Sequence, residues 1–557
     1  MHLLHVVSSV SDQPACDSKC AGARIFLPDG ARLRDAAATA ISSTFAKYPE
    51  AAAIFGDIKI GGVVTARTAW SPTRLITEPA AFLPLAVRCK TLIELGCEIQ
   101  DPALALRLVE KRAMVLHLST VLTSHTETPV GSSIVAINDH LENIGIDATV
   151  VSNGQPGHYR IVPNATHQTP LSIIIPTAGR ALNSEADAEL AIERCLASLA
   201  ATQRTDLDII LIVGDEYSGD PQDLQTKILP VRIKTRPPGK FDFATACNLG
   251  ILAARNELIL LLNDDTEVDI GAIEALAVHF GDPSIGAVGA LLRYPNGTIQ
   301  HAGMVLEENQ PRHLFLGWNP KDTEQFGGTS ARDVIAVTGA CLMTRRSLLE
   351  EVGALSPQFP LSYNDVDLCL KILFSGYRVI VEPQATLLHY ETLSREPKIH
   401  AWESNRWLDR WGAVTDPWYH HDYLHPKDRD STDLKVDQSE LTEEGRNAEL
   451  QQLHNHYFQP ETNIITSSPK YDKKLELFNL RDYIFDQQIK MKLLIEEIEN
   501  LQIRNKQLTH DLDELNRNAR EAITGLSEAN AQLRVELERG PVIRVARAVA
   551  RRLGILT

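Results

Sequence analysis

The sequence has no uninterrupted run of 18 or more apolar residues, so a transmembrane helix is not expected. It also has no excess of positive charge, because 55 Lys and Arg stand against 72 Asp and Glu and give a formal net charge of −17. General nucleic-acid binding needs clustered Lys and Arg, so a nucleic-acid partner is not expected. The amino-terminal segment lacks a basic region ahead of its short apolar stretch, which predicts no secretory leader.

Cysteine is scarce, with eight residues in 557. The eight cysteines are scattered through apolar surroundings, such as those of Cys247, Cys341 and Cys369, which predicts reduced thiols in a core. Only Cys16 and Cys20 are close together, and without a second pair of ligands they do not predict a zinc site. Reduced cysteines are typical of the cytosol, so we expect a cytoplasmic protein.

The chain is long enough for two or three domains, and its composition changes along its length. We predict a first domain over residues 1–165, where Ala-rich helical stretches mix with short strands. Residues 166–425 alternate short apolar strands, such as LSIIIPT and ELILLLND, with helical patterns. This alternation predicts an α/β fold with a mostly parallel sheet that is covered on both faces. Residues 426–474 are polar and aperiodic, which predicts a linker.

Apolar residues repeat every seven positions between 475 and 540, with a complementary seam three residues later. Such a stripe over seven heptads predicts a coiled coil, and Asn505 at an a position favours a parallel, in-register homodimer. The alternative is a single amphipathic helix packed on its own domain. The tail, residues 541–557, has four Arg and no acid. We expect it to form a basic amphipathic helix, either in peripheral contact with the inner face of the membrane or simply exposed to solvent.

Residues 101–125 and 365–389 follow the same order of helix, strand and terminal histidine. The first segment has Ala103 where the second has Asp367. This internal similarity predicts a duplicated half-domain whose first copy has lost its chemistry. Chance similarity of two helix–strand units is the alternative.

Three oxygen-bearing side chains, Asn263, Asp264 and Asp265, follow the predicted strand LILLL. The carboxyl end of a strand is where open α/β sheets bind ligands. Oxygen ligands of this kind suit Mg²⁺ or Mn²⁺ attached to a diphosphate. The alternative is that the acids only cap the next helix.

A second acidic cluster, YNDVD, opens an amphipathic helix and contains Asp365 and Asp367. Two acids spaced two apart cannot both cap the helix, which leaves one free as a general base. A third element is His389 at the end of a predicted strand, where a structural role is the more common one. We expect the three elements to converge on one site.

Six segments, in this order, resemble the successive blocks of family-2 glycosyltransferases of GT-A fold, and in particular the bacterial O-antigen and rhamnosyltransferase-like enzymes. The segments are LSIIIPTAGR (171–180), KFDFATACNLGILAARNELILLLNDDTEV (240–268), YPNGTIQHAGMVL (294–306), VTGACLMTRRSLLEEVG (337–353), LSYNDVDLCLKILFSGYRVIVEPQATLLHYETLSR (361–395) and RWGAVTDPWY (410–419). The resemblance implies a Rossmann-like GT-A catalytic domain. Residues 1–165 resemble the degenerate, partial GT-A-like domain that often precedes it.

The resemblance implies a metal-dependent, inverting hexosyltransferase that uses Mn²⁺ or Mg²⁺. Its donor would be a nucleotide-diphosphate sugar, with UDP or dTDP as the nucleotide and a hexose or deoxyhexose as the sugar. Its acceptor would be a hydroxyl of a glycan or of a lipid-linked glycan. The implied setting is the synthesis of a cell-surface polysaccharide such as O-antigen or capsule.

The same resemblance implies a role for each matching residue. Asp365 is the implied catalytic base, and Asp265 and His389 are the implied metal ligands. The residues implied to bind the nucleotide sugar are Pro176, Thr177, Arg180, Asp215, Asn248, Gly250, Asn263 and Asp264. The residues implied on the acceptor side are Gln300, His301, Gly339, Asn364 and Asp367.

Three positions depart from the family's pattern. The chain reads VGDEYS after a predicted strand, which displaces Asp215 by one position and leaves the base preference open. Asn263 stands where an Asp is frequent, and Asn364 replaces the Glu of a Glu-Asp pair. The alternatives to acceptor-side roles are that His301 satisfies a loop and that Gly339 permits close strand packing.

Two other functions stay open. A non-catalytic scaffold would act through the coiled coil and have a degenerate glycosyltransferase domain, but intact Asp265, Asp365 and His389 disfavour it. The segment ESNRW (403–407) faintly resembles an element of processive polysaccharide synthases. The lack of membrane-spanning segments argues against such a synthase.

Overall fold

The computed structural model describes most of the chain up to residue 418 and parts of the carboxyl-terminal region. The described residues are 4–7, 22–27, 30–61, 63–65, 67–127, 131–164, 169–182, 189–217, 223–224, 229–236, 238–239, 241–390, 399, 401–412, 414, 416–418, 524, 526–532, 535 and 541–552. The predicted linker and most of the predicted coiled coil lie outside the described residues. The chain divides into two units, Met1–Ile464 and Ile465–Thr557, and each is described by itself.

The second unit contains helix α16 (Pro541–Arg552), which covers most of the predicted basic tail. The expectation of a helix in the tail is confirmed, while the surroundings of that helix stay a prediction. In the ranges that the structure describes, no helix is both long and apolar enough to cross a membrane.

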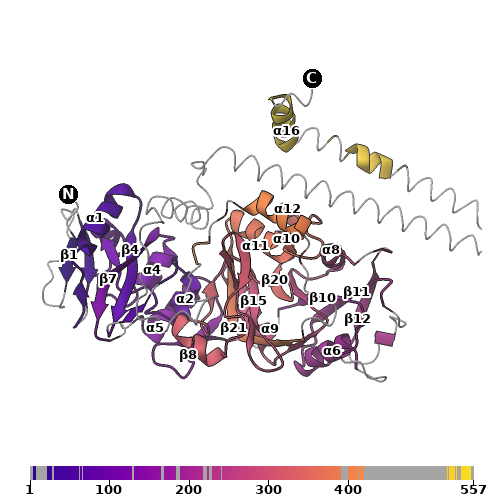
Figure 1. Cartoon of the computed structure of the whole chain (residues 1–557), viewed down its shortest axis with the longest axis horizontal. Helices are drawn as coiled ribbons and strands as arrows, with labels where there is room; N and C mark the ends of the chain where they lie inside the picture. Colours follow the sequence, from indigo (N-terminus) through magenta and orange to yellow (C-terminus); the bar gives the residue numbers. More distant parts are fainter. Residues whose placement is uncertain are drawn as a thin grey trace, which may run out of the picture. The chain divides into compact units, whose positions relative to one another are not determined.

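The first domain is built on a sheet with the strand order β1-β2-β6-β4-β7-β3, and β5 pairs with β4 (Figure 1). Its strands are β1 (Leu4–Val7), β2 (Ala23–Phe26), β3 (Arg32–Leu33), β4 (Ala53–Ile60), β5 (Val63–Thr65), β6 (Ala86–Arg88) and β7 (Val115–His125). Its helices are α1 (Ala37–Lys47), α2 (Pro72–Thr77), α3 (Cys89–Leu95), α4 (Leu104–Glu110) and α5 (Ile134–Asn143). A separate hairpin of β8 (Ala148–Ser152) and β9 (Tyr159–Pro163) follows.

The second domain is built on a larger sheet with the order β12-β11-β10-β13-β20-β15-β21-β14, to which β16 and β19 add at β15 and β21. Its strands are β10 (Leu171–Thr177), β11 (Leu207–Val213), β12 (Val231–Thr235), β13 (Leu258–Leu262), β14 (Thr266–Val268), β15 (Ile285–Arg293), β16 (Ile299–His301), β19 (Arg332–Asp333), β20 (Cys341–Arg345) and β21 (Arg378–His389). Strands β17 (Met304–Glu307) and β18 (Gln310–His313) form a separate hairpin. The helices are α6 (Ala191–Ala201), α8 (Phe243–Ala253), α9 (Ala272–Ala277), α10 (Arg346–Val352), α11 (Asn364–Phe374) and α12 (Ala401–Trp411), with short 3-10 turns η3 (Val278–Gly281) and η4 (Pro320–Phe326).

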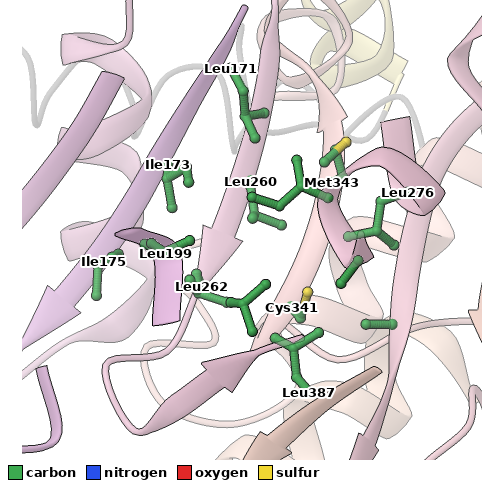
Figure 2. Packing of buried hydrophobic residues seen from close by; sticks show 14 of the residues in the cluster. Leu171, Ile173, Ile175, Leu199, Leu260, Leu262, Leu276, Cys341, Met343 and Leu387 are labelled. Atoms are coloured by element: carbon green, nitrogen blue, oxygen red, sulfur yellow. The ribbon is translucent and has the colours of Figure 1, made fainter. Parts of the chain in front are cut away.

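Helices cover both faces of the second sheet. On one face, α6 and α9 pack on alternate residues of β10 and β13 in one apolar cluster, and Figure 2 shows Leu199 of α6 near Ile175 and Leu276 of α9 near Met343. On the other face, α8 approaches so closely that a Cβ on Gly250 would lie 2.2 Å from Ile174 Cγ2. Burial on both faces explains why β10 and β13 are apolar at nearly every position.

The prediction of a mostly parallel sheet is right for one half only. Strands β12, β11, β10 and β13 are parallel, as the alternation of strand and helix predicts. Strand β20 is antiparallel to both β13 and β15, and β14 is antiparallel to β21, so the sheet is mixed. These antiparallel neighbours are far apart along the chain, since β13 ends at Leu262 and β20 begins at Cys341, so the apolar strand sequences do not reveal their direction.

The two sheets follow one topological plan. When β1-β2-β6-β4-β7-β3 is compared with β10-β13-β20-β15-β21-β14, the relative direction of neighbouring strands agrees at every step. The strands β5 and β16 also correspond, since each is antiparallel to its neighbour β4 or β15. Strands β7 and β21 both end at a histidine, His125 and His389. Only the second sheet has strands like β11 and β12 among the described residues.

A buried polar cluster joins the two domains. Asp333 of β19 accepts hydrogen bonds from the Ser71 hydroxyl and from the backbone N–H of Thr73, both in the first domain. The same carboxylate pairs with Arg378 of β21, with 2.7 Å between Nε and Oδ1. Hydrogen bonds from Ser71 and Thr73 therefore attach the first domain to a buried ion pair of the second domain.

The cysteine prediction is correct for the five described free cysteines, which are all buried: Cys97, Cys195, Cys247, Cys341 and Cys369. Burial raises the pKa of the Cys341 thiol to about 12, so it is an unreactive core residue. The prediction is wrong for Cys89, which is disulfide-bonded.

Candidate active site

The carboxyl ends of β10 and β13 bring the first group of predicted residues together. Thr177, the last residue of β10, donates a hydrogen bond from its hydroxyl to Asp264 Oδ2 at 2.6 Å. Burial, with the nearby charge of Asp265, raises the pKa of Asp264 to about 7, although bonds from Thr177 and the Ala178 N–H oppose that shift. Asp264 is therefore anchored to the β10 loop rather than turned to solvent.

Asp265 and His389 lie side by side. Strand β14 pairs with β21 so that Thr266 stands opposite His389, which places Asp265 next to the histidine. Asp265 Oδ1 is 3.0 Å from His389 Nε2, and this buried oxygen has no hydrogen-bond partner in the described part of the chain. The other ring nitrogen, Nδ1, is 2.6 Å from Gln300 Oε1, and the Asn263 amide nitrogen is 3.3 Å from Nε2.

This pair has the chemistry of an incomplete cation site. A carboxylate oxygen without a partner and an imidazole nitrogen face one another, and both are ligand types for divalent metals. Within the described ranges, no group of three or more His, Cys, Asp or Glu could hold a metal ion by itself. The pair therefore fits a cation that arrives with oxygen ligands of its own, such as those of a diphosphate.

Asp365 is held at the start of α11. The backbone N–H of Gly339 donates to Asp365 Oδ2 at 3.0 Å, and the N–H of Val366 donates to Oδ1 at 2.8 Å. The preceding residue, Tyr363, has a φ of 63°. Its ring stacks on Trp407 with centroids 5.2 Å apart. These contacts fix a half-buried carboxylate that still reaches solvent.

The turn at residues 338–340 connects the two groups. Its Ala340 carbonyl accepts a hydrogen bond from the Asn263 N–H at 3.0 Å, beside the Asp265–His389 pair. Its Gly339 N–H contacts Asp365. The backbone of this turn therefore contacts both groups, whose joint use as one site stays a proposal. A Cβ on Gly339 would lie 3.3 Å from the Phe243 ring, so glycine allows this close approach.

The loops after β10 and β11 form the other predicted side of the site. Gly179, with a φ of 64°, lies against the ring of Tyr217, and a Cβ there would be 2.6 Å from that ring. Arg180 and Asp215 are exposed, whereas Pro176 is buried. Asp215, which the sequence displaces by one position, is thus an exposed side chain in the structure.

The acid next to Asp215 is the one that points inward. Glu216 Oε2 pairs with Arg236 Nη2 at 2.6 Å, and Arg236 is almost fully buried. A sequence argument based on the position of Asp215 missed this pair. The signal available was Glu216 itself, adjacent to the expected acid.

Two residues predicted to bind the nucleotide sugar have structural roles instead. The buried Asn248 donates to the carbonyl of Leu355 at 2.8 Å and accepts from its N–H at 3.0 Å, so its amide has a structural partner at both ends. Gly250 provides the close contact with Ile174 described above. Both residues therefore have a packing role on a buried helix face, and their contact with a nucleotide sugar stays a prediction.

Two residues predicted on the acceptor side are fully buried. Asp367 is 0 % exposed, and its Oδ1 lies 2.9 Å from Arg410 Nε and accepts from the Trp411 ring nitrogen at 2.8 Å. His301 is 0 % exposed, and burial together with the charges of His313, Arg332 and His389 holds its pKa well below the ordinary value. Asn364 is buried at the first residue of α11.

His301 instead satisfies a loop. Its Nε2 accepts from the backbone N–H groups of Gly303 and Thr338, and its Nδ1 is 2.9 Å from Nδ1 of His313. The contact with Thr338 braces the turn that touches Asp365. Gln300, also expected on the acceptor side, contacts His389.

Part of the chain matches a known protein family. Residues 172–353 match the family described as Glycosyl transferase family 2. These residues form a family-2 glycosyltransferase domain. With the strand order, the match confirms the expected glycosyltransferase fold, of mixed α/β type.

Curated relatives of this glycosyltransferase domain include bacterial polysaccharide proteins. The chain is 29% identical over 382 residues to the O-antigen biosynthesis protein RfbC of Myxococcus xanthus, an alignment that covers 63% of this chain and 29% of that protein. It is 27% identical over 233 residues to an N-acetylglucosaminyl-diphospho-decaprenol L-rhamnosyltransferase of Mycobacterium tuberculosis, covering 38% of this chain and 75% of the relative. The chain spans about a third of the length of its first two relatives, RfbC and the uncharacterized protein y4gI of Sinorhizobium fredii, at 29% and 38%.

Among solved structures, the chain resembles a GalNAc-T7 crystal structure with UDP, GalNAc and Mn²⁺, with a TM-score of 0.34 and 14% identity over 48% of this chain and 52% of that one. It also resembles the mannosyltransferase PcManGT of Pyrobaculum calidifontis with GDP-Man and Mn²⁺, with a TM-score of 0.31 and 18% identity over 43% and 61%. Both superpose on this chain only in part.

Proposed function

We propose that the protein is an inverting, metal-dependent glycosyltransferase that moves a hexose or deoxyhexose from a UDP- or dTDP-sugar to a hydroxyl of a glycan or lipid-linked glycan. The single observation that supports this most is the convergence of Asp265, His389 and Asp365 around the turn at 338–340. The names of the relatives support the synthesis of O-antigen or a similar cell-surface polysaccharide as the setting.

Asp265 and His389 would hold a Mn²⁺ or Mg²⁺ ion on the leaving-group side. The support is the partnerless Asp265 Oδ1 beside His389 Nε2. When bound, the ion neutralises the negative charge that develops on the departing diphosphate. Asp264, anchored by Thr177, keeps the turn before Asp265 against the β10 loop, where the nucleotide would lie.

Asp365 would act as the general base. The acceptor oxygen forms its bond to the anomeric carbon while the bond from that carbon to the diphosphate oxygen breaks, and the acceptor proton passes to the Asp365 carboxylate. Attack from the face opposite the diphosphate inverts the anomeric configuration. The Gly339 and Val366 N–H groups keep the carboxylate fixed during this transfer. General-base assistance is typically worth ~10²–10⁴-fold in rate.

Asp365→Asn tests the base. The purified full chain is incubated with UDP- and dTDP-sugars, Mn²⁺ and a glycan acceptor, and the release of nucleoside diphosphate is measured. We expect Asp365→Asn to lower turnover by at least ~10²-fold and to leave donor affinity unchanged. Asp139→Asn, an exposed acid on α5, is the matched control and should behave as wild type.

Retained turnover in Asp365→Asn would remove that residue from the base role. Full rates in excess chelator would overturn the metal assignment. A wild-type protein inert towards every nucleotide sugar would favour a non-catalytic scaffold. The anomeric configuration of the product, read by NMR, tests inversion.

We also propose that the first domain is a partial, non-catalytic copy of the GT-A-like domain. Its support is the matching strand plan and the terminal histidines His125 and His389. If these histidines are aligned, the register of β3 and β7 puts Gly30 where the second domain has Asp265. The first copy therefore lacks one metal ligand.

We also propose an assembly and a location for the protein. Residues 475–540 would form a parallel coiled-coil dimer, and the tail would bring the dimer to the inner face of the membrane. A cytoplasmic location follows from the proposed nucleotide-sugar donor. The disulfide of Cys89 is the described feature that favours an oxidising compartment instead, and cell fractionation distinguishes the two.

A further inference from the structure

Strand β16 places two consecutive buried side chains at the site. Successive residues of a strand point to opposite faces. Gln300 contacts His389, while His301 contacts the backbone of Thr338. Gln300 is only 5 % exposed, so its amide faces protein rather than solvent. This makes Gln300 a neighbour of the proposed metal site.

The contact with Gln300 determines which nitrogen of His389 has the proton. A carbonyl oxygen can only accept, so the 2.6 Å contact with Gln300 Oε1 requires a proton on Nδ1. A neutral imidazole has one such proton, which leaves a lone pair on Nε2. The Asn263 amide nitrogen, a donor, faces Nε2 at 3.3 Å and agrees with this tautomer.

The neighbouring carboxylate of Asp265 presents an oxygen to the same ring nitrogen. Asp265 Oδ1 lies 3.0 Å from Nε2 but makes no hydrogen bond in the part of the chain that the structure describes. In the Nδ1–H tautomer, Nε2 presents a lone pair to this oxygen. Two electron-pair donors therefore lie beside one another, as a divalent cation requires.

We propose that Gln300 is a positioning residue that holds His389 in the Nδ1–H tautomer, so that Nε2 and Asp265 Oδ1 are both available to a divalent cation. The inference rests on the proposed function and deepens it. In this proposal Gln300 acts through its contact with His389. Removing such an outer partner of a ligating histidine typically lowers metal affinity by about 10–100-fold.

Two substitutions of similar size separate this role from simple packing. Gln300→Met removes the acceptor and suits a buried site, whereas Gln300→Glu keeps an acceptor for Nδ1–H but adds a buried charge. A positioning role predicts that Gln300→Met weakens Mn²⁺ binding about 10–100-fold and that Gln300→Glu stays within a few-fold of wild type. A packing role predicts the reverse order. Gln310→Met, which alters a glutamine bonded to Tyr363, is the matched control.

The experiment measures Mn²⁺ affinity of the full chain by EPR of free Mn²⁺, with UDP and with dTDP in turn, and needs no turnover. Thermal unfolding of each variant checks folding, and Gln300→Leu replaces Gln300→Met if the latter does not fold. This inference alone is overturned if Gln300→Met, or Gln300→Leu in its place, binds Mn²⁺ as tightly as wild type. It is also overturned if Gln300→Glu weakens Mn²⁺ binding more than Gln300→Met does. Wild-type protein that binds no Mn²⁺, with Asp265→Asn indistinguishable from it, overturns the metal assignment and the inference together.

Discussion

Asn248 and Leu355 form a two-way contact at the scale of single residues. The Asn248 amide both donates to and accepts from the Leu355 backbone, in a buried position on α8. The backbone carbonyl and N–H of Leu355 thus both have their hydrogen-bond partner in one side chain. The amide thus connects α8 to the segment that precedes α11.

Asn248→Ala is expected to destabilise the domain by about 2–4 kcal/mol, because it leaves a buried N–H and a buried carbonyl of Leu355 without partners. Urea unfolding measures the loss. Affinity for UDP, measured below the unfolding transition, should not change. A large loss of UDP affinity with stability preserved would return Asn248 to the nucleotide site. Asn143→Ala, at an exposed position, is the control.

Asp365 and Asp367 are two residues apart, but we expect Asp→Asn substitution to change the free energy of unfolding very differently at the two positions. Asp367→Asn leaves the buried charge of Arg410 without its carboxylate, which typically costs about 3–5 kcal/mol. Asp365→Asn should leave stability within about 0.5 kcal/mol of wild type. Denaturant unfolding of both variants gives the comparison. Equal stability losses would contradict the division between a structural and a chemical acid.

At the scale of elements, one ion pair connects three parallel strands. Asp208 of β11 forms a two-pronged contact with Arg232 of β12 and accepts a hydrogen bond from Ser172 of β10. Burial opposes ionisation of Asp208, but the bonds from Arg232 and Ser172 outweigh it and lower its pKa.

A lowered pKa gives this pair a defined pH dependence. Its stabilisation is fully present above the unfolded pKa of Asp, near 4, and is lost as the pH falls through the lower, folded value. We expect Asp208→Asn to cost about 1 kcal/mol or less at pH 7, because the pair is partly screened by solvent. The cost should shrink at pH 3. Urea unfolding at both pH values tests this, and a cost that grows on acidification would contradict it.

At the scale of the whole first unit, Asp333 couples the domains. Asp333→Ala removes the acceptor for Ser71 and Thr73 and the 2.7 Å partner of the buried Arg378. We expect a loss of about 3–5 kcal/mol and separate unfolding of the two domains. Differential scanning calorimetry should resolve two transitions where wild type has one. A single, unshifted transition would show that other contacts couple the domains.

The tail provides a prediction about location. Helix α16 has basic residues at its end and no acid in its first turn. Deletion of 541–557 is expected to move the protein from the membrane to the soluble fraction, since a basic amphipathic helix binds anionic lipid surfaces. Centrifugal fractionation followed by immunoblotting measures the shift. An unchanged distribution would assign the tail to solvent.

Much of the site could be predicted from local sequence. Asp265, Asp365 and His389 each stand at the end of a strand or the start of a helix, and these are the places where polar side chains face a ligand. The strands themselves were predictable because β10 and β13 are apolar throughout. Motif position alone did not distinguish Asn248 or Asp367 from site residues, because burial depends on the packing of distant elements.

By itself the sequence determined the strand–helix alternation of the second domain, the acids at its strand ends and the family to which residues 172–353 belong. Only the tertiary structure decided the antiparallel half of the sheet, the burial of Asp367 and His301, and the contact of Gln300 with His389. Periodicity and local propensity are properties of neighbouring residues, so a sequence reports them directly. Hydrogen-bond partners that are 89 positions apart, as Gln300 and His389 are, come together only when the whole sheet has formed.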